Sequence, residues 1–459
     1  MVAQIPIGFL YYLLFIRFKR SLEHIFSIVS LEKLKHIFSI VVSLGLFHFC
    51  LGPTAWLHSF FSALVTYLIL WFVPSPHYYR LVFVWMMGYM SVSHIYRMFM
   101  DYGGWDLDFT GPQMILTIKL TALAWNFRDG RLSSEQRREK GLNSYQLEHA
   151  LNDKELPSPI EYFGYVYFFP SFLAGPGIEY MDYLRFINLP DTASGSNTIA
   201  DIPPIQLLKA VGKKLLVTAI FLPMVLANQG YFNPHRWLTS ESFLHSTSIL
   251  YRIVMVHILM VFQRGKYYFA WSLADVGFTA CGYAYDARAN NWDRTVNVKP
   301  FIIEWPFSVA YVSSAWNSFT QMWLKNHVFF RVTKKGVKPG FAPTVLTYMV
   351  SAFWHGFYPG YYVMFFNLAI LSQVNRIVPS PEIKPKTTNQ WIYQVVHNTT
   401  LSWLVSYNGA IFTLLSLEAG TQFIKSMYGI GHIIPIIVWV VLLLFGPKRT
   451  RKRKEEEKK

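Results

Sequence analysis

Hydrophobic residues are grouped in long runs along this chain, and the polar residues between them are gathered in short blocks. The segments 54–73, 215–228 and 432–446 are almost wholly apolar. Since a membrane span needs about 20 mainly apolar residues, the pattern predicts about ten or eleven spans, one or two of them re-entrant or interfacial. The apolar segments begin near residues 5, 36, 54, 81, 160, 205, 243, 266, 343, 360, 400 and 429. We therefore predict an all-α polytopic membrane protein.

The first apolar segment is expected to stay in the protein. Its basic residues Arg17, Lys19 and Arg20 follow the apolar run instead of preceding it, and no small-residue cleavage site is visible, so it does not resemble a signal peptide. The sequence HIFSI occurs at 24–28 and again at 36–40. Two copies are too few for a repeat fold, and the amphipathic pattern predicts an interfacial helix that leads into a span.

Two polar connections, 128–159 and 190–204, are expected outside the hydrocarbon, and both are too short to be folded domains. The predicted organisation is an N-terminal segment with an interfacial helix, a single membrane domain and a basic tail. These parts cover residues 1–35, 36–446 and 447–459.

Composition agrees with a membrane protein, with 53% hydrophobic and only 15% charged residues. A charged side chain at the bilayer centre costs roughly 2.5–3.5 kcal/mol, which explains why charges are clustered. The net charge is +16, and the segment after Pro447 carries eight basic and three acidic residues. Basic residues next to a span favour the cytosolic side, so we predict a cytosolic C-terminus and no nucleic-acid binding.

Further basic blocks at 128–140, 209–214 and 331–338 are expected on the same side, where they could contact anionic lipid or a phosphorylated substrate. The chain has two cysteines, so neither a disulfide framework nor a cysteine zinc site is available, and we expect no metal. It has no GxSxG, GxxxxGK[ST], HExxH or HxxxxD motif. Direct attack on a substrate is therefore favoured over a covalent acyl-enzyme.

Polar residues inside apolar segments are the first candidates for function, because a buried polar group is costly without a partner. The segment 101–120 holds three aspartates, which a span end or loop would explain. The Pro and Gly residues of 167–180 are typical of a helix break. Asn317 could be a helix-packing amide, and His327, four residues before Arg331, resembles a span end.

The segment 351–362, SAFWHGFYPGYY, carries the strongest candidate, His355. Gly356, Pro359 and Gly360 interrupt the helix after it and can open a cavity at membrane depth. A neutral imidazole can accept a proton from an alcohol, and burial favours the neutral form. We therefore predict that His355 is a general base, with Asn317 as a positioning or oxyanion-binding partner. The predicted substrate-lining residues are Trp316, Trp354, Tyr358, Tyr361 and Tyr362.

Four ordered motifs resemble the membrane-bound O-acyltransferase family, and within it the lysophospholipid acyltransferase branch, most of all the fungal broad-specificity enzymes. They are DFTGPQMILTIKLTALAWNFRDG, YFFPSFLAGPGIEY, KYYFAWSLADVGFTACGYAY and WHGFYPGYY. The paired family signature is the WN of SSAWNSFTQMWLKNHVFFR followed one span later by the WHG that contains His355. The similarity extends over about residues 36–446, and the first 35 residues depart from it, so no function is carried over to them.

This resemblance implies transfer of an acyl group from acyl-CoA to the sn-2 hydroxyl of a lysophospholipid at the endoplasmic reticulum membrane. It also implies His355 as the catalytic residue and Asn317 as its partner. The expected partners are acyl-CoA as co-substrate, the lysophospholipid and membrane lipids, with no separate cofactor and no obligate protein partner.

Two alternatives stay open from the sequence alone. A related family member could acylate a sterol, diacylglycerol or a protein. A polytopic chain with intramembrane His and Asp could also be a transporter, although transporters usually have two halves with matching broken helices and the WHG segment occurs once.

Overall fold

The computed structural model describes the whole chain except residues 20, 23–29, 75–76, 105–107, 152–154, 174, 189–198, 334–339 and 446–459. Throughout this described part the regular structure is helical, apart from two isolated β-bridges that join Asp286 to Asn291 and Val298 to Trp316. The all-α prediction is therefore confirmed.

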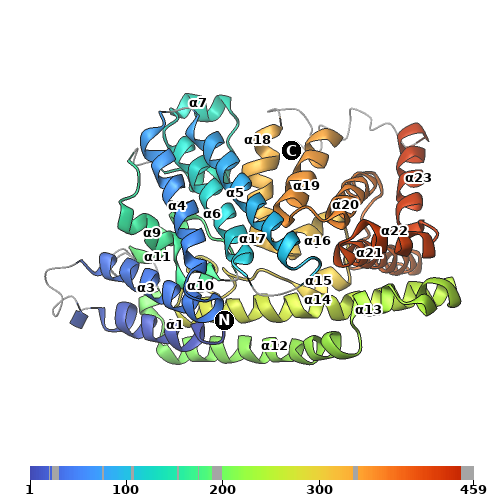
Figure 1. Cartoon of the computed structure of the whole chain (residues 1–459), viewed down its shortest axis with the longest axis horizontal. Helices are drawn as coiled ribbons and strands as arrows, with labels where there is room; N and C mark the ends of the chain where they lie inside the picture. The colour runs from blue at the N-terminus through green and yellow to red at the C-terminus, as the bar shows by residue number, and fades with distance from the viewer. Residues whose placement is uncertain are drawn as a thin grey trace.

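The N-terminal half contains upright helices and several short ones (Figure 1). Its elements are α1 (Gln4–Tyr12), η1 (Leu13–Arg17), α3 (Leu31–Leu51), α4 (Ala55–Phe72), α5 (Tyr78–Met100), α6 (Thr110–Gly130), α7 (Ser134–Glu139), α8 (Ser144–Glu148), α9 (Pro159–Val166), α10 (Phe169–Phe172), α11 (Tyr180–Ile187) and η3 (Ile199–Asp201).

The C-terminal half contains the longest helix, α14, and the segment with His355. Its elements are α12 (Pro204–Gly230), α13 (Pro234–Leu238), η4 (Ser242–Ser246), α14 (Ile249–Ala280), α15 (Pro300–Glu304), α16 (Val309–Ala315), α17 (Ser318–Trp323), η5 (Leu324–Phe329), α18 (Phe330–Val332), α19 (Phe341–His355), α20 (Pro359–Ile377), α21 (Thr388–Leu414), α22 (Leu417–Ser426) and α23 (Ile430–Phe445).

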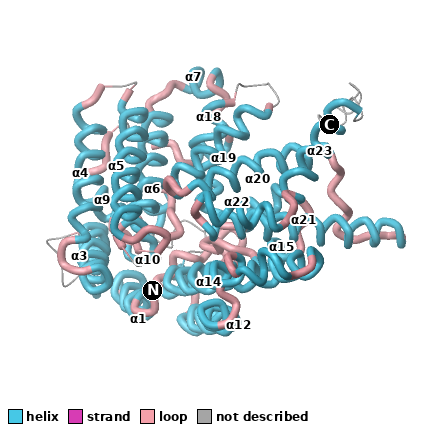
Figure 2. The backbone as a smooth tube through the Cα atoms, turned by 45° about the vertical axis from the view of Figure 1, so that its right-hand side comes forward, coloured by secondary structure: helices cyan, strands magenta, loops and turns pink. Residues whose placement is uncertain are grey.

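The helices form two groups that cross each other. In Figure 1, α4, α5 and α6 stand side by side on the left, and α12 and α14 run together across the bottom. Figure 2 shows the same crossing from a second angle, with α14 and α12 beneath the upright helices. The upright group continues through α17, α18 and α19, so the centre of the molecule lies between these helices, α14 and α20–α21.

By length and apolar composition, three described helices can cross a membrane, namely α3, α4 and α12, and the bent pair α22–α23 makes a fourth if it counts as one span. This is fewer than the predicted ten or eleven. The reason lies in the interior helices: most of the 21 residues of α6 are buried, including the polar Thr117, Lys119 and Asn126. Polar groups that pair inside the protein lower the hydropathy of a helix without contacting lipid.

Two of the predicted segment starts were wrong in detail. The segments expected from 243 and 266 are covered largely by one helix of 32 residues, α14. The sequence pattern also gave no segment start for α6, whose 21 residues begin at Thr110. In both places buried polar side chains mask the helical continuity of the chain.

The N-terminal segment packs against the rest of the protein. Tyr11 and Tyr12 of α1 are buried in the largest hydrophobic core, and α1 contacts α14. The predicted domain boundary between residues 35 and 36 falls within α3. The first HIFSI copy and the basic tail lie outside the described residues, and the second copy belongs to α3.

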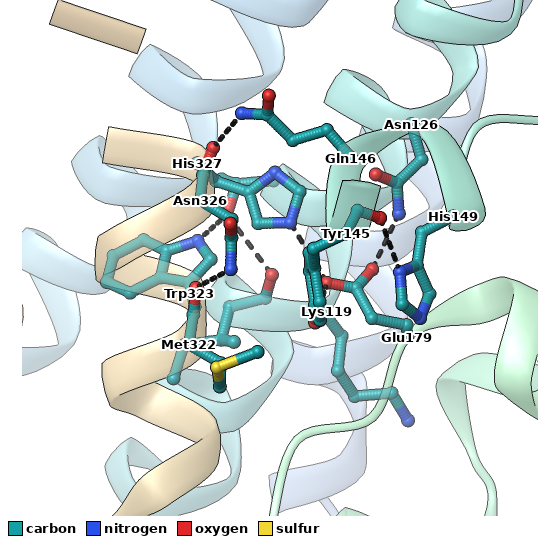
Figure 3. Close-up of polar contacts among 12 residues, drawn as sticks. Lys119, Asn126, Tyr145, Gln146, His149, Glu179, Met322, Trp323, Asn326 and His327 are labelled. Atoms are coloured by element: carbon teal, nitrogen blue, oxygen red, sulfur yellow. Dashed lines mark hydrogen bonds and ion pairs between the residues drawn. The ribbon is translucent and has the colours of Figure 1, made fainter. Parts of the chain in front are cut away.

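A buried carboxylate, Glu179, joins four helical segments. Its side chain accepts hydrogen bonds from Asn126 Nδ2 of α6 at 2.6 Å, Tyr145 Oη of α8 at 2.9 Å and His327 Nε2 of η5 at 2.9 Å. Glu179 itself stands directly before α11 and is 8% exposed. Figure 3 shows the donors pointing toward the carboxylate from both sides. His327 is 2% exposed, so the interpretation of this residue as a span end was wrong.

A second buried ion pair lies one helical turn further along the same helices. Arg331 donates two hydrogen bonds to Asp129, with Nη1 at 3.1 Å and Nη2 at 2.5 Å from the carboxylate oxygens. Trp323 of α17 also donates from Nε1 to Thr121 Oγ1 of α6 at 3.0 Å. Because bidentate pairs fix both distance and orientation, α17, η5 and α18 are held against α6 along their length.

We expect Glu179→Ala to lower the free energy of unfolding by about 3–5 kcal/mol, because removing one partner of a buried charged network leaves its donors unpaired. Thermal unfolding of the purified protein in detergent measures the change. Glu139→Ala is the matched control, since Glu139 is exposed at the end of α7 and its loss is expected to change stability by less than about 0.5 kcal/mol. Equal stability of the two variants would contradict the role of Glu179.

Candidate functional site

A cavity of about 520 Å³ lies in the centre of the protein, between α5, α6, α14, α16, α17 and α19–α21. Its walls combine aromatic and aliphatic side chains with a small number of polar groups, as ligand pockets usually do. Six of the seven predicted site residues line it: Trp316, Asn317, Trp354, His355, Tyr358 and Tyr361. Tyr362 does not belong to the cavity wall.

His355 is the last residue of α19 and faces the cavity. The helix ends here because Gly356 adopts φ +120°, which side chains with a Cβ rarely adopt, and Pro359 then begins α20. The imidazole stacks on Phe365 at 5.3 Å between ring centres and meets the edge of Phe412 at 5.0 Å. Among the described residues none forms a hydrogen bond with this imidazole, so its nitrogens are available to a substrate.

The turn after His355 is supported by a second histidine, His94 of α5. Its Nε2 donates to the backbone oxygen of Trp354 at 3.1 Å, and an added Cβ on Gly356 would lie 3.1 Å from His94 Nδ1. His94 also lines the cavity. It therefore holds the backbone before His355 by a hydrogen bond and lies close to Gly356 after it. Sequence reasoning missed this contact, because α5 and α19 are distant in the chain.

Asn317 is held in an unusual backbone conformation at the start of α17. Its φ and ψ are 47° and 57°, in the left-handed region that Asn tolerates better than most residues. The side-chain Oδ1 accepts from Asn297 Nδ2 at 3.2 Å. This contact leaves the NH2 group of Asn317 as the donor available to the cavity.

Asn297 holds both the side chain and the backbone around Asn317. Its Oδ1 accepts from the Phe319 backbone N–H at 3.1 Å, and its backbone oxygen accepts from the Ser318 N–H at 2.9 Å. Asn297 is buried, and the neighbouring Val298 forms a β-bridge with Trp316. Sequence reasoning missed Asn297, because nothing in its local pattern distinguishes it from other loop amides.

The segment that carries Asn297 is itself held by contacts with α14 and α12. Thr295 donates from Oγ1 to Asp275 of α14 at 2.5 Å, and Lys214 of α12 forms an ion pair with the other oxygen of Asp275 at 2.7 Å. A short relay of contacts therefore runs from the two long crossing helices to Asn317.

The predicted aromatic residues combine apolar faces toward the cavity with anchored polar atoms. Trp354 donates from Nε1 to the Met114 backbone oxygen at 3.0 Å, and Tyr358 Oη accepts from the Gly103 N–H at 2.8 Å. Trp316 meets Trp271 edge to face at 5.0 Å. The polar tips are thus used in packing, and the ring faces give the cavity its apolar lining.

Comparison with known protein families identifies the family of this chain. Residues 95–415 match the family model of MBOAT, the membrane-bound O-acyltransferase family, and this range contains both Asn317 and His355. The chain belongs to the membrane-bound O-acyltransferase family. The predicted family and its polytopic helical architecture are therefore confirmed. The prediction of an O-acyltransferase enzyme is confirmed as well, so the transporter alternative is not retained.

Several known relatives are similar to this chain over most of its length. The lysophospholipid acyltransferase of Schizosaccharomyces pombe is 33% identical over 83% of the chain and 75% of its own length. Membrane-bound glycerophospholipid O-acyltransferase 2 of Homo sapiens is 32% identical over 88% of the chain and 78% of its own length. The lysophospholipid acyltransferase of Saccharomyces cerevisiae is 29% identical over 84% of the chain and 65% of its own length.

We expect Asn297→Asp to reduce kcat for acyl transfer by about tenfold or more, with little change in the KM of either substrate. The aspartate keeps the acceptor for the Phe319 N–H but removes the donor to Asn317 Oδ1. The amide of Asn317 is then favoured to turn over and present its oxygen to the cavity. Steady-state kinetics of the purified protein measures the change.

Asn291→Asp provides the control for this variant. It lies in the same loop, and its Oδ1 accepts from the Asp293 N–H at 3.0 Å, a contact that the aspartate keeps. Its activity is expected to equal that of the unchanged protein. An active Asn297→Asp variant would show that Asn317 does not act as a donor.

Proposed function

We propose that this protein is a lysophospholipid acyltransferase that transfers an acyl group from acyl-CoA to the sn-2 hydroxyl of a lysophospholipid. The observation that carries the proposal is that His355 and Asn317 line one cavity, although they come from different segments. The printed names of the relatives support the substrate class, since they describe lysophospholipid and glycerophospholipid acyltransferases.

In the proposed mechanism the neutral imidazole of His355 accepts the proton of the sn-2 hydroxyl while the oxygen attacks the thioester carbonyl. Negative charge then develops on the former carbonyl oxygen, and the NH2 group of Asn317 can donate to it. Collapse of the tetrahedral intermediate forms the ester and releases coenzyme A, whose sulfur takes the proton back from the imidazolium. No covalent enzyme intermediate is needed.

The surroundings of His355 support this role. The rings of Phe365, Phe412 and Tyr361 surround the imidazole, so a substrate hydroxyl that enters the cavity meets it in apolar surroundings. The proton transfer then takes place away from bulk solvent, where dipoles act more strongly.

The orientation in the membrane is also a proposal. Basic residues of the block 128–140 gather at one end of the upright helices, around the end of α6 and the short helix α7: Arg128, Arg131, Arg137 and Arg138. This is the upper end of the molecule in Figure 1. The block 209–214, expected on the same side, lies instead on α12, at the lower edge of the molecule in Figure 1. Under the positive-inside rule the upper end faces the cytosol, together with the C-terminal tail, and the protein resides in the endoplasmic reticulum membrane. The anionic coenzyme A would enter from this side.

We expect His355→Ala to lower the turnover by about a thousandfold, because a missing general base costs roughly 10² to 10⁴ in rate. The measurement is formation of phosphatidylcholine from labelled oleoyl-CoA and lysophosphatidylcholine by purified protein, with free coenzyme A counted in the same samples. His245→Ala, at a side chain that is 71% exposed, is the control and should keep full activity. Substantial activity of His355→Ala would assign the base elsewhere.

A panel of acceptors separates the proposal from its alternative, an enzyme for another acceptor. Lysophosphatidylcholine, cholesterol and diacylglycerol are offered to the unchanged protein with the same acyl-CoA. The proposal predicts product with the lysophospholipid. Product from cholesterol alone, or from diacylglycerol alone, with none from lysophosphatidylcholine, would contradict it.

A further inference from the structure

One end of the cavity carries a positive charge close to the catalytic turn. Arg97, on the last turns of α5, lines the cavity together with His94, Gly104 and Tyr358. Arg97 stands one helical turn after His94, which contacts the backbone beside His355. The guanidinium therefore lies at the same end of the cavity as His355.

Within the described part of the cavity wall, the cationic side chains other than histidine are Arg97 and Arg264, and no lysine lines it. Arg264 is already committed: Nε and Nη2 donate to Glu304 at 2.8 and 2.5 Å, and Nη1 donates to Ser406 at 3.1 Å. Its charge is neutralised by the bidentate carboxylate of Glu304, and its side chain is 9% exposed, against 22% for Arg97. Arg97 is therefore the better candidate for an anionic ligand.

Two of the contacts of Arg97 are long. Nη1 donates to Asp108 Oδ1 at 3.3 Å and Nη2 to the Gly104 backbone oxygen at 3.2 Å. Both distances are at the long end of the usual range, whereas a guanidinium and a phosphate form short charge-assisted bonds. A phosphate can therefore form stronger hydrogen bonds with this guanidinium than these two contacts.

Asp108 retains partners when the guanidinium turns to a ligand. Its carboxylate accepts from the backbone N–H and the hydroxyl of Thr110 at 2.9 and 3.0 Å, at the start of α6. Asp108 thus positions Arg97 at the cavity without depending on it. The Arg97–Asp108 pair is partly exposed, with 22% and 26% of the side chains accessible, as expected for a pair at a site that a ligand enters.

The chemistry of the acceptor requires an anion site at this place. In a lysophospholipid the sn-2 hydroxyl and the phosphate are attached to neighbouring carbons of the glycerol. When the hydroxyl is at His355, the phosphate must therefore lie close by, at the same end of the cavity. The phosphates of coenzyme A do not meet this condition, because the long pantetheine arm separates them from the thioester.

We propose that Arg97 binds the phosphate of the lysophospholipid acceptor and thereby selects phosphorylated acceptors over neutral ones. The proposal rests on the proposed function, because it assigns a substrate group to the same cavity. Tyr358 bridges the two sites: its hydroxyl accepts from the Gly103 N–H, and its ring meets Tyr361, which packs on His355 at 5.6 Å. The phosphate site and the base are thus held by one set of contacts.

The test compares Arg97→Gln and Arg97→Lys with the unchanged protein on two acceptors that differ in the phosphate, 1-oleoyl-lysophosphatidylcholine and 1-monooleoylglycerol. We expect Arg97→Gln to raise the KM for the lysophospholipid by roughly tenfold to a hundredfold, the usual effect of losing hydrogen bonds to a charged group. Its KM for acyl-CoA and its kcat/KM for monooleoylglycerol should be unchanged. Arg97→Lys should keep part of the preference, since it retains the charge but loses the planar fork.

Arg80→Gln is the matched control, at an exposed arginine near the other end of α5, and it should behave like the unchanged protein on both acceptors. An equal loss on both acceptors, or a rise in the KM for acyl-CoA alone, would overturn the phosphate assignment. If Arg97→Gln does not fold, the test uses the preference of Arg97→Lys and of the unchanged protein for the lysophospholipid over monooleoylglycerol. Equal kcat/KM of the unchanged protein for the two acceptors would overturn the proposal. No transfer to either acceptor by the unchanged protein would instead refute the proposed function.

Discussion

The structure depends on the pairing of buried charges within an apolar protein. Glu179 is buried between helices, and it is retained there because three donors from three helical segments converge on it. In low-dielectric surroundings a satisfied network is rigid and a broken one is costly. The carboxylate therefore sets the distance between α6 and the segment from α17 to α18, and the start of that segment is Asn317.

The proposed catalytic groups, Asn317 and His355, differ from this framework because they keep polar atoms available to a ligand. The contacts that fix them use other atoms: Asn297 holds the amide oxygen of Asn317, and His94 holds the backbone beside the imidazole of His355. The NH2 group of Asn317 and the imidazole of His355 then face the cavity. Such preorganisation favours the proposed mechanism, because little reorganisation is required when charge develops.

The family, the helical class and the position of Asn317 and His355 in one site could be predicted from the sequence, because local motifs carry them. WN and WHG each lie within a few residues of the helix break that they create. Asn297 and Arg97 escaped prediction because they reach the cavity from other segments, and only the tertiary packing brings them to Asn317 and His355.

The errors in the helix pattern have a common physical cause. Lys119 lowers the hydropathy of α6, yet its amine donates to the Tyr165 and Val166 backbone oxygens at 2.6 and 3.1 Å. Arg264 interrupts the apolar run of α14, yet it is paired with Glu304. A hydropathy pattern treats such residues as facing water, because the partner that makes them compatible with burial lies far away in the sequence.

A structure of the protein with a non-transferable thioether analogue of oleoyl-CoA would test the central claim most directly. The account predicts that the sulfur and the adjoining carbon lie in the central cavity between His355 and Asn317, with the acyl chain along the aromatic walls and the nucleotide toward the basic end at α7. An analogue whose sulfur is bound outside this cavity, away from both residues, would contradict it.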